Sequence, residues 1–151
     1  MQYYNTIANS YNKLYGQEQE EKLRTIKEKI NPQGKILDLG SGTGLSKKYF
    51  KDVTCVDPSE KLLGKGDIKA NAEKLPFNDR SFDWVLCLTS VHHFNLRKAI
   101  KEIKRVSKGN YIFTILKKSP RFNEIKYYLE KNFNLKEIDS EKDLILVEHA
   151  E

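Results

Sequence analysis

The sequence predicts an α/β protein of three layers, in which helices cover both faces of a mostly parallel, seven-stranded sheet. Short apolar runs typical of strands alternate with helical segments along the chain, which is the pattern of βαβ units. A glycine-rich turn directly follows the first of these strands. The last two strands follow one another without a helix, so we expect an antiparallel hairpin at one edge of the sheet.

The predicted elements begin with two helices, a short aromatic one over residues 3–15 and a second over residues 17–30. Pro32 and Gly34 end the second helix, and a compact strand follows over residues 35–39. The later elements are helices over residues 45–50, 59–63, 95–106 and 120–131, and strands over residues 53–57, 67–70, 81–88, 110–116, 135–138 and 144–149. No repeat, linker or low-complexity segment interrupts them, so we expect residues 1–151 to form one domain.

The composition predicts one protein core and a strongly charged surface. Hydrophobic residues make up 38% of the chain and charged residues 32%, with a formal net charge of +6. No apolar run approaches the roughly 18 residues of a membrane-spanning helix. Cys55 and Cys87 lie inside strand-like runs, which favours reduced core cysteines, no metal site and a cytoplasmic location. The positive charge fits an anionic partner, although lysine-rich surfaces also arise without one.

The glycine-rich turn over residues 40–44 favours a nucleotide-like ligand. Glycines let the backbone turn tightly, and they let a ligand lie against the main chain without a Cβ in the way. Alone, such a turn also serves plain connections between a strand and a helix. Asp57 strengthens the ligand interpretation, because an acid at the end of the next strand can accept hydrogen bonds from both ribose hydroxyls. The alternative for Asp57 is a solvated turn acid ahead of Pro58.

The spacing of the glycines indicates which nucleotide. A dinucleotide-binding turn places its last glycine three residues after the second, but Leu45 occupies that position and the pattern here is G-x-G-x-G. No lysine stands at the phosphate-loop position either. A ligand with ribose and adenine but without phosphate fits better, and S-adenosylmethionine is such a ligand.

Together these segments resemble the class I S-adenosylmethionine-dependent methyltransferases. The resemblance is greatest to the type 11 group, which contains quinone-biosynthesis and tRNA wobble-uridine methyltransferases. It runs from Ile36 to about Tyr111 and implies a Rossmann-like methyltransferase sandwich. It also implies that residues 38–44 lie along the methionine part of the cofactor, and that Asp57 binds the ribose with Pro58 and Ser59 beside the adenine.

Other segments extend the resemblance to both ends of the cofactor. Asn71 and Ala72 begin a segment that the family writes Asp-Ala-x-x-Leu-Pro-Phe, and the amide oxygen of Asn71 can still accept a hydrogen bond from adenine. The Leu88 carbonyl and Thr89 are implied at the amino-acid end. Tyr11 resembles an N-terminal segment that folds over the cofactor, so residues 1–30 are expected to form a lid, although an aromatic packing stripe has the same spacing. The expected cofactor-binding residues are Tyr11, Asp38, Gly40, Ser41, Gly42, Gly44, Asp57, Pro58, Ser59, Asn71, Ala72, Leu88 and Thr89.

His92 and His93 are the candidate catalytic residues. Methyl transfer from a sulfonium is an in-line displacement, in which positioning and exclusion of water supply much of the rate. Both histidines follow the strand over residues 81–88 at the edge where open α/β sheets bind ligands, so either could act as a base. Packing or cofactor support is the alternative for each. The chain has no Asn-Pro-Pro-Tyr segment and no nucleophilic cysteine in a suitable place, so we expect an oxygen or nitrogen acceptor.

The segments around the predicted site favour a macromolecular acceptor, tRNA or protein. The chain passes from Leu116 into the next helix without the insertion that encloses small substrates in many relatives. Lys117, Lys118 and Arg121 form a candidate cationic rim for phosphates, although solvated loop lysines fit equally well. The resemblance to the wobble-uridine enzymes adds a small activator subunit as a candidate partner. A small-molecule methyltransferase and a non-catalytic S-adenosylmethionine-binding subunit are the alternatives.

Overall fold

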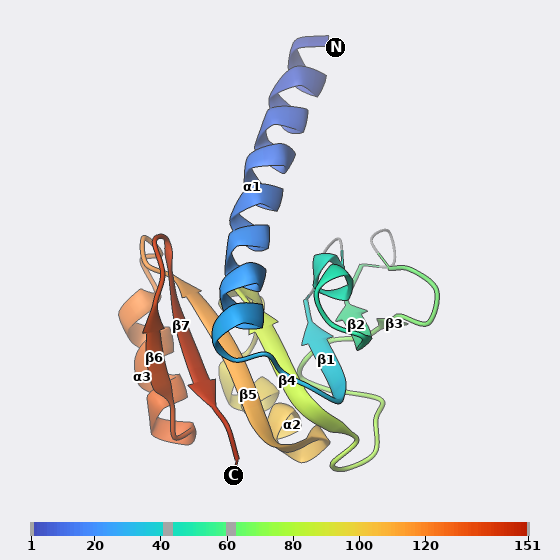
Figure 1. The fold of residues 1–151 in the computed structure, drawn as a ribbon, viewed down its shortest axis with the longest axis vertical. Coiled ribbons are helices and arrows are strands. Elements are labelled where there is room, and N and C mark those ends of the chain that lie inside the picture. The colour runs from blue at the N-terminus through green and yellow to red at the C-terminus, as the bar shows by residue number, and fades with distance from the viewer. Residues whose placement is uncertain (1, 41–43, 60–62, 151) are drawn as a thin grey trace.

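The computed structural model describes residues 2–40, 44–59 and 63–150, with side chains from residue 16 onward. Within these residues the chain forms a seven-stranded sheet in the order β3-β2-β1-β4-β5-β7-β6 (Figure 1). The strands are β1 (Lys35–Leu39), β2 (Asp52–Asp57), β3 (Ile68–Lys69), β4 (Phe82–Leu88), β5 (Ser107–Leu116), β6 (Lys136–Asp139) and β7 (Asp143–Glu148). The first five pair in parallel, and β7 runs antiparallel between β5 and β6. The predicted fold class is therefore confirmed.

Helices cover both faces of this sheet, because neighbouring strand residues point to opposite sides. Leu37 and Val85 join the core beneath α2 and α3, whereas Ile36 and Trp84 join the core beneath the second half of α1. Figure 1 shows α2 and α3 on the face away from α1. The helices are α1 (Gln2–Lys29), α2 (Leu96–Val106) and α3 (Phe122–Asn132), with short 3₁₀ turns η1 (Leu45–Lys48) and η3 (Ser90–His93).

The helical N-terminus differs from the prediction of two helices. Residues 2–29 form one continuous helix, and Figure 1 shows its N-terminal half extending beyond the sheet. Gly16 does not interrupt it, because a glycine inside a helix costs only about 1 kcal/mol and the chain supplies no capping residue there. The side chain of Tyr11 lies outside the described residues, so the lid over residues 1–30 remains a prediction.

Two other boundaries were expected elsewhere. The segment after β1 is a 3₁₀ turn of four residues and not a helix to Phe50. Strand β5 begins at Ser107, three residues before the predicted start, because Ser107 pairs with Phe82 across an irregularity in the β4–β5 register. Gly109 accommodates this irregularity with a φ of +119°. The predicted helix over residues 59–63 falls mostly outside the described residues.

Candidate functional site

The carboxyl ends of β1, β2 and β4 meet at one edge of the sheet and border a cavity of about 320 Å³. Binding at this edge is general for open α/β sheets. The cavity lining contains five residues predicted to bind the cofactor and one predicted to be catalytic, namely Gly40, Asp57, Pro58, Asn71, Ala72 and His93. The sequence reading missed three others, Glu73, Ser90 and Phe94. Segments that are distant in the sequence thus converge on one cavity.

Gly40 begins the cavity wall at the end of β1, and the fold requires glycine there for two reasons. Its φ is +69°, which disfavours any residue with a Cβ. A Cβ at Gly40 would also lie 2.6 Å from the Cβ of Ser90. The turn after β1 therefore packs directly against the turn after β4. Ser41 and Gly42 lie outside the described residues, and Gly44 precedes η1 with a φ of +73°.

Asp38, the last acid before this turn, is buried and only half satisfied. Its Oδ2 accepts a hydrogen bond from Ser46 Oγ at 2.5 Å, and Oδ1 has no hydrogen-bond partner among the residues that the structure describes. Burial raises the pKa of Asp38 to about 6, against the opposing hydrogen bond from Ser46. A cationic group on a ligand would satisfy Oδ1, and the ammonium of S-adenosylmethionine is such a group.

The end of β2 joins the residues expected at the ribose and at the adenine. Asp57 Oδ1 accepts a hydrogen bond from the Ser59 amide at 2.9 Å, which orients the carboxylate. The carbonyl of Asp57 accepts from the Ala70 amide at 3.2 Å, and this brings Asn71 beside it. Asn71 is exposed on the cavity wall, whereas Ala72 is buried. Ser59 is exposed and does not line the cavity.

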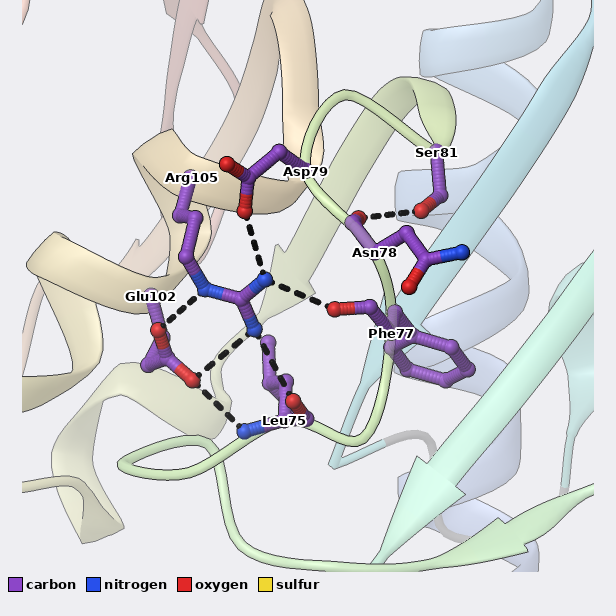
Figure 2. A network of polar contacts seen from close by, with 7 residues as sticks. All are labelled: Leu75, Phe77, Asn78, Asp79, Ser81, Glu102 and Arg105. Carbon is purple, nitrogen blue, oxygen red and sulfur yellow. Dashed lines mark hydrogen bonds and ion pairs between the residues drawn. The ribbon is translucent and has the colours of Figure 1, made fainter.

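A polar clamp on α2 holds the segment that we call the adenosine loop, residues 71–79 (Figure 2). The Arg105 guanidinium donates to the carbonyls of Leu75 and Phe77 at 2.9 and 2.7 Å, and to the Asp79 carboxylate at 2.9 Å. Glu102 accepts from Arg105 Nε at 2.7 Å and from the Leu75 amide at 2.8 Å. These bonds keep Arg105 charged by raising its pKa further, and they lower the pKa of Glu102. The loop is fixed through its backbone.

Glu73 makes a second connection between the adenosine loop and α2. Its Oε1 accepts from the Asn95 amide at 2.8 Å, while the Asn95 side chain caps α2 by accepting from the Lys98 amide at 3.3 Å. From the sequence, Glu73 could have been predicted to line the cavity only because it follows Asn71 in the loop. An acid two residues after Asn71 does not belong to any recognised motif.

Thr89 ends β4 in a backbone conformation that is rare for its residue type. Its φ is +66° and its ψ is −8°, which for a β-branched residue costs about 1–3 kcal/mol. The Thr89 amide donates to the Thr114 carbonyl at 3.2 Å, and its Oγ1 accepts from Lys22 Nζ at 2.5 Å. Leu88 is buried, and neither Leu88 nor Thr89 lines the cavity, although Ser90 and His93 directly after them do.

The two histidines have different environments. His92 Nε2 accepts from the Leu116 amide at 3.4 Å, so Nδ1 carries the proton toward Ser119 Oγ at 3.2 Å. Burial lowers the pKa of His92, and nearby positive charges lower it further. Its ring is therefore neutral and holds the loop between β5 and α3. His93 is exposed and lines the cavity, so the geometry favours His93 over His92 as the residue that meets an acceptor.

Comparison with protein families identifies the family to which this chain belongs. A family model described as a methyltransferase domain matches residues 37–115, more than half of the chain. The chain belongs to this methyltransferase family. The match includes the turn after β1, the ends of β2 and β4, the adenosine loop and the clamp. The cofactor implied by this family is S-adenosylmethionine.

Individual proteins that resemble this chain include two that are named as methyltransferases. Uncharacterized protein MJ1252 of Methanocaldococcus jannaschii is 33% identical over 126 residues, which cover 76% of this chain and 50% of that protein. The demethylmenaquinone methyltransferase of Thermotoga maritima is 29% identical, with coverages of 80% and 62%. A solved S-adenosylmethionine-dependent methyltransferase of Thermotoga maritima, named as a possible histamine N-methyltransferase, is 27% identical with a TM-score of 0.60 and coverages of 82% and 66%. The chain spans half the length of the first of these relatives.

The predicted cationic rim of the methyltransferase lies at this edge of the sheet, but two of its three charges are paired. Lys117 Nζ donates to Asp139 at 2.6 Å and to the Ser140 carbonyl at 2.5 Å. Arg121 pairs with Glu124 at 3.2 Å and donates to the His92 carbonyl at 3.1 Å. Lys118 is exposed, and no ion pair involves it in the part of the chain that the structure describes. Of these three rim residues, Lys118 alone has no acidic partner among the described residues.

Metal-ligating side chains and long apolar helices are the remaining features of the described residues that bear on function. No three histidine, cysteine, aspartate or glutamate side chains among them gather as a metal site would require. None of their helices combines the length and apolar character needed to span a membrane. Cys55 and Cys87 are both buried, as expected for core cysteines.

Proposed function

We propose that this methyltransferase binds S-adenosylmethionine in the cavity and transfers its methyl group to an oxygen or nitrogen acceptor that approaches beside His93. One observation carries the proposal: the turn after β1, the end of β2, the adenosine loop and the turn after β4 all reach one cavity of about 320 Å³. This size lies at the lower end of the about 300–1,000 Å³ typical of small-molecule sites. The membership of the chain in a methyltransferase family supports the proposal.

Each binding residue has a role that follows from its chemistry. The Asp57 carboxylate accepts hydrogen bonds from the ribose hydroxyls, and the Asn71 amide meets the adenine edge. Asp38 Oδ1, buried and without a partner in the described chain, accepts from the ammonium of the methionine part. The cofactor thus extends from Asn71 across Gly40 toward the ends of β1 and β4. Ser41, Gly42 and Tyr11, which resemblance adds to this set, remain predictions.

The bound cofactor supplies an electrophilic methyl group on a sulfonium. The protein has to hold an acceptor in line with it and to exclude water. His93 lies on the cavity wall and is exposed, so its ring can take a proton from an acceptor hydroxyl or amine. His92, whose ring nitrogens bond to Leu116 and Ser119, contributes by holding the neighbouring loop.

For the acceptor we favour a small molecule. The relative named demethylmenaquinone methyltransferase supports this class, and the pairing of Lys117 and Arg121 removes most of the expected phosphate rim. A macromolecular acceptor, tRNA or protein, with or without a small activator subunit, is the second candidate. It is supported by the net charge of +6 and by the exposed Lys118.

The binding test uses Asp57→Ala in calorimetry with S-adenosylmethionine. Loss of hydrogen bonds from two ribose hydroxyls to a charged group weakens the affinity about a hundredfold. Asp52→Ala is the matched control, because Asp52 is an exposed acid at the opposite end of the same strand. Unchanged affinity of Asp57→Ala would contradict the ribose assignment.

The acceptor test transfers labelled methyl from the cofactor into a cell extract separated into RNA, protein and metabolites. Label in the metabolite fraction supports the small-molecule class, and label in RNA or protein supports the second candidate. Tight cofactor binding without label in any fraction favours a non-catalytic binding subunit.

A further inference from the structure

Lys22 is a buried lysine on α1 whose side chain reaches the end of β4. Its side chain is 5% exposed. The ammonium lies 3.4 Å from Asp143 Oδ2, at the start of β7, and donates to Thr89 Oγ1 at 2.5 Å. Thr89 Oγ1 also lies 3.4 Å from Thr114 Oγ1 on β5. One ammonium group therefore connects the N-terminal helix with the start of β7 and with Thr89 directly after β4, and Thr89 in turn contacts β5.

Stability of the protein core alone does not account for the ion pair between Lys22 and Asp143. Burial lowers the pKa of Lys22 and raises the pKa of Asp143, so both charges are opposed by their surroundings. Asp143 Oδ1 has no hydrogen-bond partner within the described residues. A buried pair of this kind is often no more stable than apolar residues of similar volume.

Docking of α1 has a second attachment that does not involve burial. Lys142 pairs with Glu18 at 2.7 Å, one helical turn before Lys22, and the two side chains are 44% and 28% exposed, against 5% for Lys22. Attachment of α1 to the β6–β7 turn therefore does not require a charge at Lys22. The pair of Lys142 and Glu18 does not contact Thr89.

The position of Thr89 indicates what the hydrogen bond from the Lys22 ammonium contributes. Thr89 turns the chain with a φ of +66°, and Ser90 and His93 follow in η3 as part of the cavity wall. A hydrogen bond to Oγ1 restrains the side chain of the residue that sets the direction of this turn. Asp57 and Asn71, which form the other end of the cavity, lie on β2 and in the loop after β3, on the far side of β1.

We propose that Lys22 is a positioning residue of the methyl-transfer site: held by Asp143, it fixes Thr89 in its left-handed turn and so sets the cavity wall that faces the methionine end of the cofactor. The inference rests on the proposed function, because it assumes that the cofactor lies in this cavity. It assigns to α1 a contribution to cofactor binding that is independent of the residues before Gly16.

Two ligands separate this role from general stability. S-adenosylmethionine occupies both ends of the cavity, whereas 5′-methylthioadenosine has the adenosine part but no amino-acid group. Calorimetry of Lys22→Met is expected to show about tenfold weaker binding of S-adenosylmethionine and unchanged binding of 5′-methylthioadenosine. Lys142→Met is the matched control: it removes the exposed attachment of α1 and leaves both affinities unchanged.

Thr89→Ala serves as a second variant in case Lys22→Met does not fold. It removes the acceptor of the Lys22 bond, keeps the pair with Asp143, and is expected to give the same selective loss. The double variant should be no weaker than either single variant, because both remove one interaction.

The outcomes are distinct. A selective loss of S-adenosylmethionine affinity in Lys22→Met and Thr89→Ala, absent in Lys142→Met, supports the proposal. Wild-type affinities for both ligands in the two variants overturn it, as does an equal loss for both ligands, which would indicate a structural role only. If the wild-type protein itself binds neither ligand, the proposed function is wrong and the inference falls with it.

Discussion

The adenosine end of the cavity and the predicted acceptor end, which is the rim of Lys117, Lys118 and Arg121 outside the cavity lining, are both held by polar contacts but use them differently. At the adenosine end, Arg105 and Glu102 bond to backbone groups of the loop over residues 71–79, so the side chain of Asn71 is left to face a ligand. At the acceptor end, Lys117 and Arg121 bond to neighbouring carboxylates and carbonyls. There the side chains expected to meet a substrate are themselves occupied.

This difference between backbone contacts and side-chain pairs has different consequences for binding of the cofactor and of the acceptor. Contacts that fix a backbone create a binding surface whose shape does not depend on the ligand. Contacts that neutralise rim cations leave His93 and Lys118 as the groups available to an acceptor. Under the proposed function, the surface that meets the cofactor would therefore be set by the fold, and the acceptor would meet few exposed side chains.

The largest expected effect is at the adenosine end. Arg105→Met removes the donor to the Leu75 and Phe77 carbonyls and leaves the carboxylate of Glu102 without its charged partner. Bonds to a charged group of this kind contribute about 2 kcal/mol or more to stability. We expect a clear fall in the thermal midpoint and about tenfold weaker binding of 5′-methylthioadenosine.

The control for the clamp is Asp79→Asn, since Asp79 is 75% exposed and contacts the same guanidinium. An exposed pair contributes about 0–1 kcal/mol, so this variant should behave almost as wild type. If Arg105→Met also binds 5′-methylthioadenosine as wild type does, the adenosine end is not held by the clamp, and the contrast between the two ends fails.

Asp38 is buried in β1 directly before the glycine turn, and its titration gives the next effect in size. Its pKa in the folded protein is about 6, above the 3.8 of an unperturbed carboxyl, so the stability supplied by its protonated form is present below pH 3.8 and is lost as the pH rises through 6. A cationic ligand group requires the carboxylate. Affinity for S-adenosylmethionine should therefore increase about tenfold from pH 5 to pH 7 and then level off.

Calorimetry in two buffers of different ionisation enthalpy checks this, because binding near pH 5.5 should release a proton from Asp38. Asp38→Asn should remove both the pH dependence and the proton release. A pH profile that is unchanged in Asp38→Asn would place the titration on another group and would remove Asp38 from the methionine end.

The sequence was sufficient for the sheet and for bringing five of the predicted cofactor-binding residues to one cavity, because both depend on local signals. Apolar runs fixed the strands, and the spacing of Gly40 and Asp57 placed two residues that the fold brings to one cavity. The contributions of Glu73, Arg105 and Lys22 were not accessible in this way, since each depends on a contact across 22 to 67 residues of sequence. No periodicity reports such contacts.

Side-chain pairing also lowers the charge that the predicted rim presents. The sequence placed Lys117 and Arg121 correctly at the ligand-binding edge, but their partners differ in kind. Glu124 lies three residues after Arg121, which immediately precedes α3, and this pair could have been anticipated from its spacing. Asp139 reaches Lys117 only because β6 and β7 form the edge hairpin beside β5. A charge counted from sequence is therefore an upper bound on the charge that a substrate meets.

The smallest expected effect distinguishes Lys117 from Lys118. Lys117→Ala removes an exposed pair and should lower stability by about 1 kcal/mol or less, whereas Lys118→Ala should not change stability. If tRNA is the acceptor, binding measured over a range of salt concentrations should lose about one unit of log–log slope in Lys118→Ala and less in Lys117→Ala, because Asp139 already neutralises Lys117. An equal loss of slope in both variants would mean that the pair of Lys117 and Asp139 opens when RNA binds. Lys117 would then belong to the acceptor site. Absence of tRNA binding by the wild-type protein at low salt would instead leave the small-molecule acceptor, and the paired rim would then be part of the scaffold that holds His93.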